Sequence, residues 1–404
     1  MRIVHIEDFI HPDTGYQVNL LSRLQVQQGH EVFVVTAELD KVPTVLTQFF
    51  GRDNIEARDR RFQEATGVEI IRVPLLGWYS GRAIFYPRIF KIVDSLQPDV
   101  AFVHGEDVLT GILYILRSSK LNYPLVLDDH SVEMGSVHKL NGLFRLFFRT
   151  IITPQILRKN IPLIRVVDSD YVEKHYGFPL ERTTLLSFGT DTSYFRPDPD
   201  RKTEFRRKYA IGLNDFVVIY AGKLDKHKGG QFFADAIREK LVTASGRKIV
   251  VVVVGTTTGE YGKKVEETFA RSETRMLRFP TQTYSDLAPF YQAADLSIFP
   301  KQCSLSFFEV QSCGLPVLVE QNEINDLRVQ FGNGERFAPE DIGDFRSKLV
   351  QFAEMSEEKF KVLRVNARRY VQDNYDFVPI ARKFTDLMAN EVERFKQKRR
   401  QGRR

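Results

Sequence analysis

The chain has 404 residues, too many for one ordinary core and enough for two domains of similar size. Its 43% hydrophobic and 27% charged residues exclude a disordered or fibrous protein. Two cysteines are too few for a disulfide framework, and the longest apolar run, 249–254, is too short to span a bilayer. Acidic residues also interrupt the first apolar segment, where a signal peptide would have none, so we expect a cytoplasmic protein.

The net charge of +6 comes partly from a basic tail, Arg394–Arg404. Such a balance is compatible with nucleic acid, an anionic lipid surface or an acidic substrate, and equally with a solvated helix end. We expect no nucleic-acid partner and leave open a peripheral contact with an anionic membrane at the inner face of the cell membrane.

The first half alternates predicted strands with helical segments, as in a doubly wound α/β sheet. Its first elements are a strand over Arg2–Glu7 and a helix over Tyr16–Gln28, which Gly29 ends. Further strands are predicted at Glu31–Thr36, Glu69–Val73, Val100–His104, Leu125–Asp128 and Leu163–Val167.

A linker follows the first half. After a short predicted helix at Tyr171–Tyr176 and a strand at Thr184–Ser187, the segment Gly189–Pro199 contains two prolines among small polar residues. We therefore assign residues 1–190 to a first domain and residues 191–378 to a second.

The second half repeats the alternation, which predicts two doubly wound, Rossmann-like domains facing a central cleft. The predicted strands are Phe216–Ala221, Lys248–Gly255, Arg275–Phe279, Leu296–Phe299 and Pro316–Glu320. The predicted helices are Gln231–Lys240, Tyr261–Phe269, Tyr284–Ala293, Phe308–Cys313 and, within residues 379–404, Pro379 to about Lys398.

Two segments of the second half carry a chemical pattern. Gly222–Gly230 places fixed cations and glycines at a strand-to-helix turn, and Glu309 lies at the start of a predicted helix. Departure of a nucleoside diphosphate from a sugar leaves negative charge that Lys223 and Lys228 would stabilise without a metal. An ionised Glu309 would accept hydrogen bonds from both ribose hydroxyls. Together these residues indicate a nucleotide-sugar site.

At these residues the chain resembles the retaining family 4 glycosyltransferases of the GT-B fold. Lys223 stands at the arginine of the family's Gly-Arg-Leu, Lys228-Gly229 at its Lys-Gly, and Glu309 at the second glutamate of its Glu-x7-Glu motif. The first glutamate of that motif falls on Lys301, so either the donor sugar is held differently or the activity is altered. In the family a final helix crosses back to the first domain, and residues 379–404 are long enough to do so.

The resemblance implies further site residues. Gly222 and Gly229 would belong to the donor site, and Ser304 and Ser306 would hold the diphosphate or sugar hydroxyls, although capping the following helix is the simpler role. Gly15, after the first strand, would face the ligands, or is a plain turn glycine.

His130, beyond the strand Leu125–Asp128, would orient the sugar as part of the catalytic set, or is a loop histidine without chemistry; His104 is the second choice. Asp168-Ser169-Asp170 matches a metal-binding Asp-x-Asp pattern, but we interpret it as structural, with Asp170 capping a helix. No metal and no cofactor is expected.

Two basic and aromatic stretches, Trp78–Arg88 and Leu143–Ile152, are compatible with a membrane interface or with core packing and snorkelling arginines. We favour the membrane interpretation because many members of the family act on lipid-linked acceptors.

The resemblance implies a retaining, metal-independent glycosyltransferase that moves a sugar from a UDP- or GDP-sugar to a glycan or a lipid-linked acceptor in polysaccharide or glycolipid synthesis. In the family, the acceptor attacks on the face that the diphosphate leaves, and the departing phosphate takes its proton. Two alternatives remain: a non-catalytic GT-B subunit that binds a partner enzyme, and a nucleotide-sugar epimerase.

Overall fold

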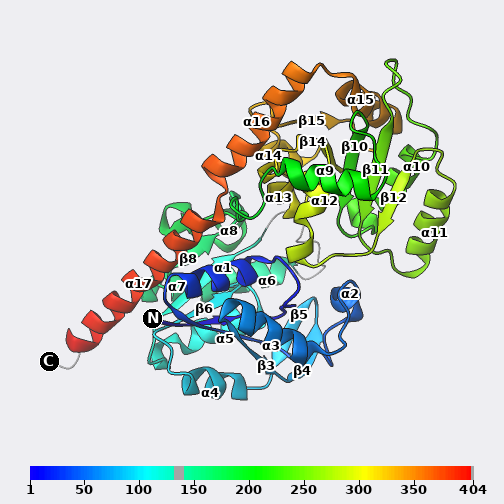
Figure 1. Cartoon of the computed structure of the whole chain (residues 1–404). Coiled ribbons are helices and arrows are strands. Elements are labelled where there is room, and N and C mark those ends of the chain that lie inside the picture. The colour runs from blue at the N-terminus through cyan, green and yellow to red at the C-terminus, as the bar shows by residue number, and fades with distance from the viewer. Residues whose placement is uncertain (132–140, 402–404) are drawn as a thin grey trace. The chain divides into compact units, whose positions relative to one another are not determined.

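The structure is a computed structural model that describes residues 1–131 and 141–401. The chain forms two compact units (Figure 1). Unit 1 comprises Met1–Thr47, Gly51–Phe188 and Phe377–Arg404, and unit 2 comprises Gln48–Phe50 and Gly189–Asp376. The end of the basic tail, 402–404, lies outside the described residues.

Unit 1 is built on a seven-stranded parallel sheet in the order β3-β2-β1-β6-β7-β8-β9, and a separate antiparallel hairpin, β4-β5, accompanies it. The strand order reverses between β1 and β6, which makes this pair the switch point of the sheet. The strands are β1 (Arg2–Ile6), β2 (Glu31–Ala37), β3 (Glu69–Val73), β4 (Leu75–Tyr79), β5 (Arg82–Phe85), β6 (Val100–His104), β7 (Leu125–Asp129), β8 (Leu163–Arg165) and β9 (Thr183–Leu185).

The helices of unit 1 include one that comes from the far end of the chain. They are α1 (Gln17–Gln27), α2 (Thr44–Thr47), α3 (Ile55–Thr66), α4 (Arg88–Ser95), α5 (Leu109–Arg117), η1 (Ser118–Lys120), α6 (Asn141–Phe147), a π-helical turn at Phe148–Ile152, α7 (Thr153–Lys159), α8 (Tyr171–Tyr176), η4 (Leu180–Arg182) and α17 (Phe377–Gln401).

α17 packs beside α1 in unit 1 (Figure 1). Its buried residues Ile380, Phe384, Met388 and Val392 recur every fourth position and so form one apolar face of the helix. The ring of Phe384 lies 6.0 Å from that of Phe102 on β6, which joins the helix to the sheet.

Unit 2 is built on a six-stranded parallel sheet in the order β12-β11-β10-β13-β14-β15, with its switch point between β10 and β13. β11 is buried along its whole length, as expected of an apolar run inside a parallel sheet. The strands are β10 (Phe216–Ala221), β11 (Ile249–Val254), β12 (Met276–Phe279), β13 (Leu296–Phe299), β14 (Val317–Glu320) and β15 (Gly334–Phe337). The helices are α9 (Pro199–Lys208), η5 (Lys226–Lys228), α10 (Gly230–Ala236), α11 (Gly259–Ala270), η6 (Tyr284–Asp286), α12 (Ala288–Ala293), α13 (Ser306–Ser312), α14 (Glu323–Arg328), α15 (Ile342–Glu354) and α16 (Glu357–Asn374).

These two parallel sheets with their helices confirm the predicted pair of Rossmann-like domains. Several boundaries were predicted wrongly. The helix expected over Gln231–Lys240 ends at Ala236, because side chains occupy the carbonyl groups that a longer helix would use: Arg346 donates to Ala236 O at 2.6 Å and Ser272 Oγ to Ile237 O at 2.7 Å. The helix expected over Tyr284–Ala293 divides into η6 and α12, because Pro289 lacks an N–H and fits only a first helical turn.

The expected Asp170 cap is also wrong. Asp170 occupies the N-cap position of α8, but its side chain makes no capping hydrogen bond. Ser169 Oγ instead accepts a hydrogen bond from Tyr171 N at 3.2 Å, and Asp168 pairs with Arg165 at 3.4 Å. Among the described residues, no helix is both long enough and apolar enough to cross a bilayer.

Candidate active site

The turn after β10 is shaped by close backbone packing. A Cβ placed on Gly255, at the end of β11, would lie 2.0 Å from Gly222 O, so only glycine lets the two strand ends approach this closely. Asp225 then caps η5 by accepting a hydrogen bond from Lys228 N at 2.9 Å. Gly229, with φ +73°, turns the chain from η5 into α10. The predicted strand-to-helix turn is therefore present.

The two lysines of this turn are held in different ways. Lys228 Nζ donates to Gln302 O at 3.1 Å, which connects the turn after β10 to the loop after β13. Lys223 is fixed through its backbone, since Tyr220 Oη donates to Lys223 O at 2.6 Å. Burial lowers the pKa of both lysines. Both lysines therefore belong to the turn after β10, and Lys228 connects this turn to the loop that carries the predicted serines.

The loop after β13 carries the predicted serines. Ser304 Oγ and Ser306 Oγ lie 2.6 Å apart, and Ser306 Oγ lies 3.5 Å from Ala221 O at the end of β10. Arg328 donates to Ser304 O at 3.2 Å, and its guanidinium lies 5.1 Å from the ring centre of Phe308. Neither serine caps α13, for which no capping side chain is present. The simpler role expected for them is therefore wrong.

Glu309 lies in the first turn of α13 and is only 6% exposed. Tyr291 Oη, on α12, donates a hydrogen bond of 2.9 Å to Glu309 Oε2. Burial raises the pKa of Glu309 to about 7, and this hydrogen bond opposes the rise. A carboxyl group with this pKa changes charge near neutral pH, so the number of hydrogen bonds that it can accept depends on pH.

Lys301 lies against the lysine and glycine turn. A Cβ on Gly229 would be 3.0 Å from Lys301 Cγ. The ammonium group of Lys301 pairs with Glu340 at 2.8 Å, and this hydrogen bond raises its pKa. Glu320, at the end of the neighbouring strand β14, adds a second negative charge nearby.

In unit 1, His130 follows β7 and its side chain is 39% exposed. Its Nε2 lies 3.1 Å from Asp128 Oδ2, and its ring centre is 5.5 Å from that of Phe188. Burial alone would lower the pKa of His130, but the Asp128 carboxylate raises it to about 9. His104, at the end of β6, reaches the same carboxylate, with its Nδ1 2.8 Å from Asp128 Oδ2.

Among the described residues, His104, Asp128 and His130 are the side chains close enough to share a metal ion. Their ligand atoms all lie within 4.8 Å of one another. The separations of 2.8 and 3.1 Å are those of hydrogen bonds. Ligands around a tetrahedral zinc ion, with bonds of about 2.0 Å, lie about 3.3 Å apart. The expectation that the protein uses no metal stays a prediction.

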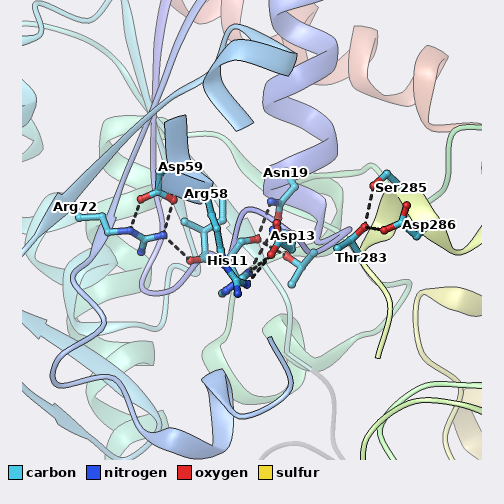
Figure 2. A network of polar contacts seen from close by, with 11 residues as sticks. His11, Asp13, Asn19, Arg58, Asp59, Arg72, Thr283, Ser285 and Asp286 are labelled. Carbon is cyan, nitrogen blue, oxygen red and sulfur yellow. Dashed lines mark hydrogen bonds and ion pairs between the residues drawn. The ribbon is translucent and has the colours of Figure 1, made fainter. Parts of the chain in front are cut away.

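Gly15 lies in the loop between β1 and α1, and polar contacts hold this loop in place (Figure 2). The carbonyl oxygen of His11 accepts hydrogen bonds from Thr14 Oγ1 at 2.8 Å and Asn19 Nδ2 at 3.1 Å. Arg58, on α3, pairs with Asp13 at 2.8 Å (Figure 2). These contacts fix the path of the loop, and the binding role of Gly15 stays a prediction.

The sequence analysis did not identify three residues of these sites: Asp128, Tyr291 and Arg328. Asp128 lies two residues before His130 at a strand end, which was a usable signal for an acid that orients an imidazole. Tyr291 and Arg328 reach the second site from α12 and α14 and carry no recognisable spacing. Only the fold brings them to Glu309 and Ser304.

The chain is similar to several known glycosyltransferases. Residues 215–355 match the family model described as Glycosyl transferases group 1. A D-inositol 3-phosphate glycosyltransferase of Corynebacterium aurimucosum is 28% identical over 249 residues, which cover 58% of this chain and 59% of that protein. One from Corynebacterium jeikeium is 29% identical over 40% of this chain and 42% of the relative. The chain thus matches roughly half the length of these relatives.

Solved structures resemble the whole chain. A glycosyltransferase from Rickettsia africae has a TM-score of 0.72 at 14% identity and covers 97% of this chain and 98% of its own. HepE from Anabaena, solved with UDP, has a TM-score of 0.71 at 16% identity and covers 96% of this chain and 100% of its own. Residues 215–355 are therefore similar to the group 1 glycosyltransferases, within a chain that has the GT-B fold.

Proposed function

We propose that this protein is a retaining, metal-independent glycosyltransferase that uses a UDP- or GDP-sugar. One observation carries the proposal. Lys223 and Lys228 follow β10, and Ser304, Ser306 and Glu309 follow β13, so the residues flank the switch point of unit 2, where open α/β sheets bind ligands. The group 1 family match covers the same segments.

The proposed chemistry rests on charge. Lys223 and Lys228 stabilise the negative charge that develops on the departing diphosphate, and the ionised form of Glu309 accepts hydrogen bonds from the ribose. His130 orients the sugar. The diphosphate itself takes the acceptor's proton, so the reaction needs no protein base.

UDP is the nucleotide we favour, because HepE, a protein of the same fold, was solved with UDP and with UDP-glucose. The acceptor we propose is a hydroxyl of a glycan or a lipid-linked saccharide. A phosphorylated inositol is the second acceptor to test, because the relatives are named D-inositol 3-phosphate glycosyltransferases.

We further propose that unit 1 contacts a membrane through three exposed apolar side chains: Leu143 (69% exposed), Leu146 (57%) and Ile151 (45%). Arg145, in the same stretch, donates to Tyr171 Oη at 3.2 Å and so contributes to the fold. Replacing both leucines with serine should reduce co-sedimentation with anionic vesicles; unchanged binding would refute the contact.

Labelled UDP- and GDP-sugars test the function. Nucleotide release that requires an acceptor supports transfer, isomerised donor supports an epimerase, and nucleotide binding without turnover supports a non-catalytic subunit. Lys228→Ala should reduce transfer by about ten- to a hundredfold, the loss of one hydrogen bond to a charged group. Lys226→Ala, an exposed lysine of the same η5 turn, is the matched control. Full transfer by Lys228→Ala would remove Lys228 from the site.

A further inference from the structure

A line of polar side chains runs from the interior of unit 1 to His130. Gln25 on α1, His5 on β1 and His104 on β6 are at most 4% exposed. His5 Nε2 lies 2.7 Å from Gln25 Oε1, and His5 Nδ1 lies 2.9 Å from His104 Nε2. Asp128 Oδ2 then lies 2.8 Å from His104 Nδ1 and 3.1 Å from His130 Nε2. Every ring nitrogen of His5 and His104 therefore has a polar partner.

The inner end of this line is neutral. Burial, with the nearby His104, lowers the pKa of His5 to about 3, so His5 has a proton on one ring nitrogen and a lone pair on the other. Gln25 contacts His5 Nε2 at 2.7 Å and Met388 Sδ at 3.5 Å, and so holds the His5 ring from α1. The His5 end of the line therefore carries no charge.

The outer end of the line is a carboxylate. Burial alone would raise the pKa of Asp128, but the imidazoles of His130 and His104 hold it well below its usual range. As a carboxylate, Asp128 only accepts, and its Oδ1 already accepts a hydrogen bond from Gly105 N at 2.7 Å. His104 Nδ1 and His130 Nε2 must then both donate to Oδ2.

We propose that His104 and Asp128 are positioning residues that hold His130 as an imidazolium with its ring fixed, so that His130 acts as a hydrogen-bond donor and never as a base. Asp128 accepts a hydrogen bond from Nε2–H of His130, and Nδ1–H is free to donate to an oxygen of the substrate. The ligand class, a sugar hydroxyl or a phosphate oxygen, rests on the proposed function. The protonation of His130 does not.

The charges around His130 support this state. Asp128 and Asp129 face it from β7, Glu7 faces it from the end of β1, and His104 lies across the shared carboxylate. Burial raises the pKa of Glu7 and Asp129, so each is a weaker partner than Asp128. Asp128 is thus the group whose loss should change His130 most.

Histidine ring ¹⁵N spectra of the full-length, ligand-free protein test the proton arrangement without any substrate. At about pH 7.5 we expect His5 neutral, His104 with a proton on Nδ1, and His130 doubly protonated. A neutral His130 would overturn the proposal, as would stoichiometric zinc in the purified protein that His104→Gln removes.

Variants then test the link to His130. Asp128→Asn should lower the titration midpoint of His130 by more than two pH units, whereas His104→Gln should not lower it and exposed Asp168→Asn is the control. If the enzyme transfers sugar, Asp128→Asn should lose activity at about pH 7.5 and regain part of it at about pH 6, where His130 charges unaided. If the titration midpoint of His130 in Asp128→Asn equals that of wild type, the positioning role is refuted. If neither wild type nor any variant transfers sugar, only the proposed function is refuted.

Discussion

Replacing Glu309 with glutamine should make unit 2 more stable at alkaline pH and leave it nearly unchanged at acid pH. Burial raises the pKa of Glu309 from 4.5 to about 7. Because the folded pKa is the higher one, the favourable contribution is complete below about pH 4.5 and is lost as the pH rises through about 7. At 1.36 kcal/mol per unit, the full loss is about 3 kcal/mol. Glu309→Gln keeps the oxygen that accepts from Tyr291 and removes the charge.

Calorimetry at about pH 5 and about pH 8 measures this effect in the transition of unit 2. The difference between variant and wild type should change by about 2.5 kcal/mol between the two pH values, a shift of about 5 to 10 °C in the midpoint for a unit of this size. The variant should also lose the increase in UDP affinity that wild type gains as Glu309 ionises. An equal stability difference at both pH values would refute the burial argument.

Three further outcomes are expected. Tyr291→Phe removes the hydrogen-bond donor that opposes the raised pKa of Glu309, so the titration midpoint of this carboxyl group, measured by ¹³C spectra, should move above about 7. The free energy of unfolding of unit 2 should fall by about 1.5 to 3 kcal/mol. An unmoved midpoint would contradict the contact. Gly255→Ala places a Cβ 2.0 Å from Gly222 O and should destabilise unit 2 by at least about 2 kcal/mol by calorimetry, whereas Gly77→Ala, where nothing lies within 4 Å, should not affect it. Lys301→Glu breaks the ion pair with Glu340 and should alter the relative rates of transfer from different donor sugars. The affinity for UDP, measured by calorimetric titration, should stay the same. A loss of UDP affinity would instead indicate that Lys301 contacts the diphosphate.

The sequence was most informative where the chemistry is local. The apolar run 249–254 and the turn Gly222–Gly230 predict a buried parallel strand and a strand-to-helix turn from neighbouring residues alone, and both are present. The sequence could not predict hydrogen bonds between residues of distant segments. Arg346 ends α10 from more than a hundred residues away, and Tyr291 reaches Glu309 from a different helix. Such contacts depend on how elements pack, which no spacing pattern records.

The same limit applies to the histidines. The sequence placed His104 and His130 at strand ends, but only the parallel order of β1, β6 and β7 shows that His5, His104 and Asp128 lie in one line. Helix and strand periodicity describes one element at a time. A hydrogen-bonded line across three adjacent strands requires their order in the sheet.

The placement of α17 has a consequence for how the protein is made. Unit 1 needs this helix to cover the apolar surface around Phe102, yet Phe377–Gln401 leaves the ribosome only after all of unit 2. Unit 2 is nearly continuous in the chain and can complete its sheet first, while the earlier-made unit 1 waits with an exposed apolar strip. That strip is a natural binding site for a chaperone during synthesis, and a chain cut short before α17 would retain it permanently.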